Sequence, residues 1–336
     1  MNNYTQLSDA QKRAVLTQCK NMMGLPEQAV EKDYWVTVML QLIFDSALSK
    51  HIIFKGGTSL SKNGNLIERF SEDIDLAVNY EYFGLNDEPT KNQLKKLRKS
   101  SSLFVREALA GAIATQIKCY GLQDQLSITV EPDGVGDNTY PEPRLIYIQY
   151  QSLLPAFLDY IKPMIVLEIG ARSLMEPSMK LQVKSIIEDT LPQINTDVVQ
   201  VKVTTAAPQK TFLEKAFLLH ELFSVEHDAL PANRRSRHLY DLNRMMDRDF
   251  AVEAVRDDAL WEHIRHHREK FTSILGVDYS GDIRDHICLV PPEKHIDDWK
   301  KDYQYMCDSM IYGEKPSFAE LMESMKELER RFRERE

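Results

Sequence analysis

The segment 54–78 combines residue types that bind a polyphosphate with residue types that bind the metal ions accompanying it. An apolar run, 51–54, predicts a strand, and the small residues after it predict a sharp turn into a helix. Such a turn presents backbone N–H groups and hydroxyls to an anion. The residues predicted to contact phosphate at this turn are Gly56, Gly57, Thr58 and Ser59.

Two aspartates follow on the next predicted strand, 73–78. Alternation along that strand places Asp73 and Asp75 on one face and apolar side chains on the other. Carboxylate oxygens are the ligands that Mg²⁺ prefers, and two of them beside a phosphate-binding turn suit metal-assisted transfer from a nucleoside triphosphate. The segment therefore predicts a nucleotide and metal site.

Glycine pairs and Asp-x-Asp sequences each occur by chance, and an isolated Asp-x-Asp is usually a solvated strand edge. In this order, on a strand–turn–helix–strand frame, they resemble the signature of polymerase-β-type nucleotidyltransferases. In more detail, segments 56–60 and 69–76 resemble the AbiEii/AbiGii nucleotidyltransferase toxins, a family that includes the MenT tRNA-modifying toxins. The resemblance extends over residues 25–310 and is most specific in these two segments.

The resemblance implies an enzyme that moves NMP from an NTP to an acceptor hydroxyl and releases pyrophosphate. It implies two Mg²⁺ ions, with Mn²⁺ as a substitute, held by Asp73, Asp75 and a third carboxylate. It also implies the 3′ end of tRNA as the acceptor. The partner would be a separately encoded antitoxin, and the role abortive infection, an antiviral defence.

Glu168 is the first candidate for the third carboxylate. It lies in the apolar run 164–171, where a charged side chain is costly to bury unless it is paired or bound to metal. A salt bridge to Arg172 is the structural alternative. Glu131, on another predicted strand, is the second candidate.

Ser71 and Arg69 precede the aspartates. The Ser-x-Asp spacing of Ser71 and Asp73 matches the family motif, and residues two apart on a strand share a face, so Ser71 is expected at the site. For Arg69 two roles stay open: it neutralises triphosphate charge or it pairs with Glu72.

Lys215 and Asp241 lie far along the chain and match a lysine and a later aspartate in the family. The resemblance implies that Lys215 acts as a point charge on the triphosphate and that Asp241 orients this lysine or the base. Without the resemblance, Lys215 would be read as a surface lysine paired within its helix. Arg237 and His238 are further candidate contacts to nucleotide or RNA.

The composition is typical of a globular protein, with 336 residues, 43% hydrophobic residues and a net charge of −9. The polar N-terminus and the lack of long apolar runs predict a cytoplasmic protein without membrane contact. The scattered cysteines suggest neither disulfides nor zinc. The net charge argues against a general nucleic-acid coat. Two local basic clusters are candidate RNA contacts: Lys91, Lys95, Lys96, Arg98 and Lys99, and Arg234, Arg235 and Arg237.

The pattern predicts an α+β fold with a mixed β-sheet, N-terminal helices and a helical C-terminal part, and the resemblance implies that the sheet belongs to a polymerase-β-like nucleotidyltransferase core. We expect one domain over 1–205 and a helical domain over 206–336 that completes the nucleotide site. Predicted elements are two helices in 1–50, a helix over 90–118, strands at 126–131, 144–151, 163–170 and 198–204, and a helix over 181–189.

Two other functions stay open at this stage. One is an enzyme that transfers AMP to a protein hydroxyl. The other is a non-catalytic protein that keeps the fold to bind a nucleotide or a partner. The intact pair Asp73 and Asp75 counts against the second, because two repelling carboxylates have no purpose in a retired site.

Overall fold

The computed structural model describes residues 2–64, 66–154, 161–196, 201–225 and 232–335. It divides into two compact units. Unit 1 comprises Met1–Asn63 and Phe70–Thr205, and unit 2 comprises Gly64–Arg69 and Ala206–Glu336. The short segment Gly64–Arg69 thus belongs to unit 2 although unit 1 flanks it in the sequence.

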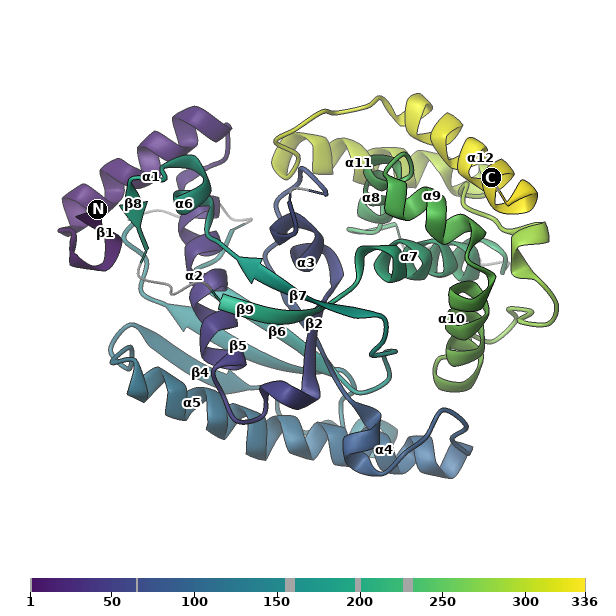
Figure 1. Cartoon of the computed structure of the whole chain (residues 1–336), viewed down its shortest axis with the longest axis horizontal. Helices are drawn as coiled ribbons and strands as arrows, with labels where there is room; N and C mark the ends of the chain where they lie inside the picture. Colours follow the sequence, from purple (N-terminus) through teal and green to yellow (C-terminus); the bar gives the residue numbers. More distant parts are fainter. Residues whose placement is uncertain (1, 65, 155–160, 197–200, 226–231, 336) are drawn as a thin grey trace. The chain divides into compact units, whose positions relative to one another are not determined.

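Unit 1 is built on a seven-stranded mixed sheet with strand order β4-β5-β6-β3-β2-β9-β7 (Figure 1). Its central strands are antiparallel in the pair β2–β3 and parallel in the pairs β3–β6 and β2–β9. A separate pair, β1 with β8, is parallel. The strands are β1 Asn2–Asn3, β2 Ile52–Lys55, β3 Ile74–Val78, β4 Leu126–Val130, β5 Arg144–Tyr150, β6 Met164–Gly170, β7 Ser178–Val183, β8 Ile194–Asn195 and β9 Val201–Ala206.

The helices of unit 1 include one that is buried on every side. They are α1 Asp9–Met23, α2 Glu27–Phe44, α3 Gly56–Lys62, α4 Lys91–Phe104, α5 Ala110–Cys119 and α6 Ile186–Thr190, with a π-helical turn, Val105–Leu109, joining α4 to α5. Every residue of α2 from Ala29 to Ile43 is buried, because the helix packs against β6, α1, α5 and α6 (Figure 1). A helix enclosed in this way carries its charged residues into the interior.

Unit 2 is a set of helices around an aromatic core. They are α7 Pro208–Phe223, α8 Arg237–Met245, α9 Asp249–Arg256, α10 Asp258–Phe271, α11 Ile296–Ser309 and α12 Phe318–Glu334. The ring of Trp261 lies 4.3 Å from that of Phe217 and 5.2 Å from that of Phe332, between centroids. These contacts join α7, α10 and α12 into one core.

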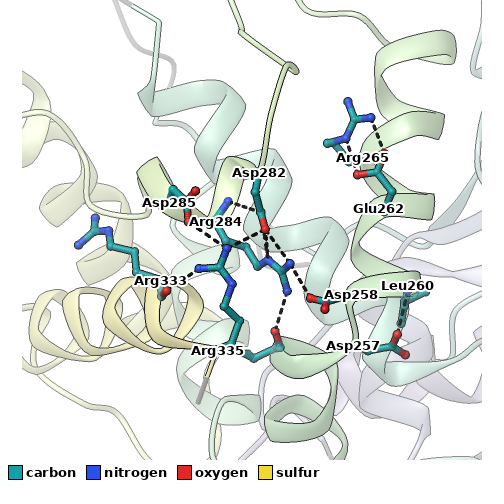
Figure 2. A network of polar contacts seen from close by, with 11 residues as sticks. Asp257, Asp258, Leu260, Glu262, Arg265, Asp282, Arg284, Asp285, Arg333 and Arg335 are labelled. Atoms are coloured by element: carbon teal, nitrogen blue, oxygen red, sulfur yellow. Dashed lines mark hydrogen bonds and ion pairs between the residues drawn. The ribbon is translucent and has the colours of Figure 1, made fainter.

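An ion-pair network fixes the C-terminal end of α12 (Figure 2). Arg335, the residue that caps this helix, donates to Asp282 at 2.8 Å and to Asp285 at 2.9 Å. Arg284 donates to Asp282 at 2.7 Å, and its guanidinium lies over the ring of Trp261. Partial burial opposes the charge of Asp282, but the hydrogen bonds from Arg284 outweigh it and lower the pKa of Asp282 to about 2. This network therefore stabilises unit 2 internally.

The predicted fold class is confirmed, with a mixed sheet, N-terminal helices and a helical C-terminal part. The helix predicted over 181–189 is wrong. Strand β7 occupies Ser178–Val183, and only Ile186–Thr190 is helical. Met179, Leu181 and Val183 alternate with polar residues, and this period of two favours a strand. Of the strand predicted at 198–204, the part 198–200 lies outside the described residues. None of the described helices is long and apolar enough to cross a bilayer.

Candidate active site

The turn between β2 and α3 has the predicted form. The strand ends at Lys55, and the chain enters α3 directly at Gly56. Gly56 has φ +78°, a left-handed conformation that L side chains rarely adopt. Glycine is required here by the backbone as well as by the space around it.

Gly56 lies against the second aspartate of the motif. A Cβ atom added to Gly56 would be 2.0 Å from Oδ2 of Asp75 and 2.8 Å from its Cγ. The carboxylate of Asp75 therefore rests on the bare backbone of the turn. Strand pairing brings the two together, because Lys55 of β2 is the register partner of Asp75 of β3.

We expect Gly56→Ala to lower nucleotidyl transfer about a hundredfold, since the new methyl group displaces the Asp75 carboxylate. Gly24→Ala is a matched control, because Gly24 also has a positive φ of 73° but has no atom within 4 Å of the added Cβ. Both variants should lose roughly 1–2 kcal/mol of stability from backbone strain. Steady-state kinetics and thermal melts measure the two effects. Equal activity losses in both variants would contradict the close-approach argument.

The hydroxyls near the turn are hydrogen-bonded within the fold. Ser59 Oγ donates to the carbonyl of Gly56 at 2.8 Å. Thr58 Oγ1 lies 2.9 Å from Ser71 Oγ and also bonds the carbonyl oxygen of Asp73. A carbonyl oxygen only accepts, so the single proton of Thr58 goes to Asp73 and Ser71 donates to Thr58. Thr58 thus ties the start of α3 to the backbone just before β3.

The candidate third carboxylate stands directly beside Asp75. β3 and β6 are parallel neighbours, and Asp75 is the register partner of Glu168, whose side chain is exposed. Directly paired residues share a face and lie about one strand spacing apart, roughly 4.8 Å. Leu145 of β5 is the register partner of Glu168, and Glu131 lies on the far side of Leu145. Glu131 is therefore about three strand spacings from Asp75. The geometry favours Glu168 over Glu131.

Lys55 is a candidate that the sequence reading passed over. It is half-buried, faces the same side as Asp75 and Glu168, and makes no ion pair within the described part of the chain. A cation beside two carboxylates suits a polyanionic substrate. Its position at a strand end beside the glycine pair was visible, but its pairing with Asp75 depends on a strand order that the sequence does not state.

The donor set fits magnesium without forming a closed cage. Among the described residues, no group of three or more His, Cys, Asp or Glu side chains is arranged to hold a metal ion. Mg²⁺ needs only one or two carboxylates from the protein, because substrate phosphates and water complete its shell. The neighbouring oxygens of Asp75 and Glu168, with Asp73 immediately before β3, supply that chemistry.

Three of the predicted site residues lie in unit 2 and form a buried ionic cluster there. Arg69 donates to Asp241 through Nε at 2.7 Å and Nη2 at 2.8 Å, and Lys215 Nζ lies 2.9 Å from Asp241 Oδ2. Burial by itself raises the pKa of Asp241, but the charges and hydrogen bonds of Arg69 and Lys215 outweigh it and hold this pKa well below its usual value. Burial also lowers the pKa of Lys215, and Asp241 opposes that shift.

In the structure Arg69 and Glu72 each pair with a different residue. Arg69 is only 1% exposed and forms its bidentate pair with Asp241, and Glu72 of unit 1 pairs with Lys32 at 2.7 Å. Lys215 is buried, so the surface-pair interpretation of this lysine is wrong. The orienting contact of Asp241 on Lys215 is present in unit 2, and the role of both toward a nucleotide stays a prediction.

The two basic clusters differ in exposure. Lys91, Lys95, Lys96 and Lys99 are exposed on α4, and the ammonium of Lys99 lies over the ring of Tyr140. The cluster 234–238 begins in a tight turn, where the backbone of Arg234 donates to Asp302 at 2.6 Å. His238 Nδ1 lies 3.4 Å from Lys215 Nζ, and burial together with the charge of Lys215 lowers the pKa of His238 well below its ordinary value.

Comparison with known proteins defines the class to which this fold and these residues belong. The family described as "Nucleotidyl transferase AbiEii toxin, Type IV TA system" matches residues 38–324. The chain belongs to this family and is a nucleotidyltransferase. The predicted recognition is thereby confirmed.

Among solved structures, one similar chain is MenT4, a nucleotidyltransferase toxin from Mycobacterium tuberculosis H37Rv. It has 15% sequence identity, the match covers 88% of this chain and 98% of that one, and the TM-score is 0.41. No curated protein sequence gives a significant match.

Proposed function

We propose that this protein is a Mg²⁺-dependent toxin that transfers NMP from an NTP to a hydroxyl group of RNA, with the 3′ end of tRNA as the acceptor. The observation that carries the metal-dependent part is that Lys55, Asp75 and Glu168 are register partners on three adjacent strands. Two carboxylates and a cation there share one face, beside a glycine whose backbone touches Asp75. The family supplies the reaction class.

In this proposal Asp73, Asp75 and Glu168 hold the metal ions. When bound, these ions would lower the pKa of the attacking hydroxyl and neutralise the leaving pyrophosphate. The acceptor oxygen forms a bond to the α-phosphorus as the bond from that phosphorus to the bridging oxygen breaks. The acceptor proton passes to solvent, and pyrophosphate leaves with the electron pair. Lys55 and the Gly56–Gly57 turn bind triphosphate oxygens.

An RNA acceptor is supported by local charge. The exposed lysines on α4 provide a positive surface in a chain whose net charge is −9, and phosphate contacts of that kind are sensitive to salt. A protein hydroxyl as acceptor needs no such surface. The family belongs to type IV toxin–antitoxin systems, so a separately encoded antitoxin is part of the proposal.

The deciding experiment incubates the protein with Mg²⁺, each α-labelled NTP in turn and total tRNA, with Asp75→Ala alongside. Label on tRNA with the parent alone supports the proposal and identifies the donor nucleotide. Replacing Lys95, Lys96 and Lys99 by Ala should weaken labelling of tRNA and make the remaining labelling less sensitive to added salt than in the parent, because fewer phosphate contacts are left to screen. Label on protein instead of tRNA would identify a protein hydroxyl as the acceptor. No label from a folded parent that still binds NTP would favour a non-catalytic protein.

A further inference from the structure

Three consecutive charged residues, Glu31, Lys32 and Asp33, lie inside unit 1 on the enclosed helix α2. Their exposed fractions are 1%, 3% and 8%. Successive helical positions point about 100° apart, so the three side chains leave α2 in different directions. Burying a charge is costly unless it is paired. Each of the three has a partner in a different segment of unit 1.

Lys32 holds the segment that leads into the aspartate pair. Its ammonium lies 2.7 Å from Oε2 of Glu72, which is 7% exposed. Glu72 stands between Ser71 and Asp73, and burial alternates here: Glu72 is buried, whereas Ser71 and Asp73 are half-buried. The inward pair with Lys32 therefore fixes the backbone that presents Ser71 and Asp73 on the opposite side.

Asp33 holds the helix that follows the glycine turn. Its Oδ1 lies 2.6 Å from the ammonium of Lys62, the last residue of α3. Lys62 also donates to Thr37 Oγ1 of α2 at 3.0 Å. The far end of α3 is thus attached to α2 by two contacts, while its near end begins at Gly56.

We propose that Lys32 and Asp33 are positioning residues for nucleotidyl transfer. Through Glu72 and Lys62 they set where the aspartate segment stands relative to the Gly56 turn. Neither residue contacts the substrate. This inference rests on the proposed function, because it assigns a purpose to the positions of Asp73 and Asp75 as metal ligands.

An ion pair is useful here because it fixes the position of one particular side chain relative to another. Apolar side chains of similar volume often replace a buried ion pair at no cost in stability. They do not specify a distance of 2.7 Å between two particular atoms, as the pair of Lys32 with Glu72 does. A double variant, Lys32→Met with Glu72→Leu, therefore separates the two roles: it restores stability and leaves the aspartate segment without its fixed position.

Glu31 provides a matched control on the same helix. It is as buried as Lys32, but its carboxylate accepts from Ser152 Oγ at 2.6 Å and from the backbone N–H of Leu153 at 2.7 Å. The segment it holds follows β5 and carries no proposed site residue. Glu31→Gln removes a buried charge from α2 without touching the aspartate segment or α3.

The test measures kcat per folded molecule, KM for NTP, the Mg²⁺ concentration for half-maximal rate, and Mn²⁺ binding by electron paramagnetic resonance with NTP but no acceptor. We expect Lys32→Met and the double variant to lose roughly ten- to a hundredfold in kcat and in Mn²⁺ affinity, with little change in KM. Lys32→Arg should recover most of the loss. Glu31→Gln should keep parental kcat.

Two different results would overturn two different claims. If Asp75→Asn binds Mn²⁺ as tightly as the parent, the proposed metal site fails. If Asp75→Asn weakens Mn²⁺ binding but the stable double variant matches the parent in kcat and Mn²⁺ affinity, Lys32 has only a structural role and the inference fails. The double variant keeps the test valid where Lys32→Met alone does not fold.

Discussion

Asp75→Asn should lower kcat/KM for nucleotidyl transfer at least a thousandfold while leaving the protein folded. The carboxylate supplies a metal ligand, and metal-ion stabilisation contributes several kcal/mol to such a transition state, of which about 4 kcal/mol corresponds to this factor. The thermal midpoint should stay equal or rise. Asp75 and Glu168 are like charges in direct register across β3 and β6, and such pairs repel.

The comparison needs a variant that removes one negative charge elsewhere in unit 1. Asp124→Asn serves, because Asp124 is exposed and lies outside the site. It should keep parental activity and melting behaviour. A large drop in the melting temperature of Asp75→Asn would mean that this aspartate is structural. Parental activity in Asp75→Asn would remove it from the site.

The local part of the site could be predicted from the sequence because it depends on neighbouring residues. A strand that ends in paired glycines and an alternating Asp-x-Asp strand are read over a few positions, and β2, α3 and β3 stand where expected. Ser71 and Asp73 themselves precede β3, yet burial still alternates through them.

Contacts between residues far apart in the sequence could not be predicted from such local patterns. Glu168 stands beside Asp75 only because β6 pairs with β3, although more than eighty residues separate them in the sequence. The sequence predicted α2 as one of two helices within residues 1–50, and an amphipathic helical pattern assigns charged residues to solvent. Nothing in such a pattern indicates that Lys32 and Asp33 are buried and paired. Arg69 was predicted either to neutralise triphosphate charge or to pair with its neighbour Glu72, whereas its partner Asp241 is 172 residues away.

The buried cluster of Arg69, Lys215 and Asp241 gives the largest expected change in stability. Asp241 is fully buried and is the carboxylate between two buried cations. Asp241→Asn leaves Arg69 and Lys215 without that countercharge, and breaking a buried pair costs about 3–5 kcal/mol. Urea unfolding at pH 7 measures this loss. Arg69→Met in the Asp241→Asn background should cost far less than in the parent, since the pair is already broken.

The loss should also depend on pH, with a sign that the lowered pKa of Asp241 determines. In the unfolded chain this carboxyl takes up a proton near pH 3.8, while in unit 2 it stays ionised to lower pH. Its contribution to stability is therefore complete above pH 3.8 and declines as the pH falls below that value. Asp241→Asn lacks the titrating group, so the stability difference from the parent should shrink by roughly 1 kcal/mol between pH 5 and pH 3. An unchanged difference over this interval would mean that Asp241 is not held ionised by its two cations.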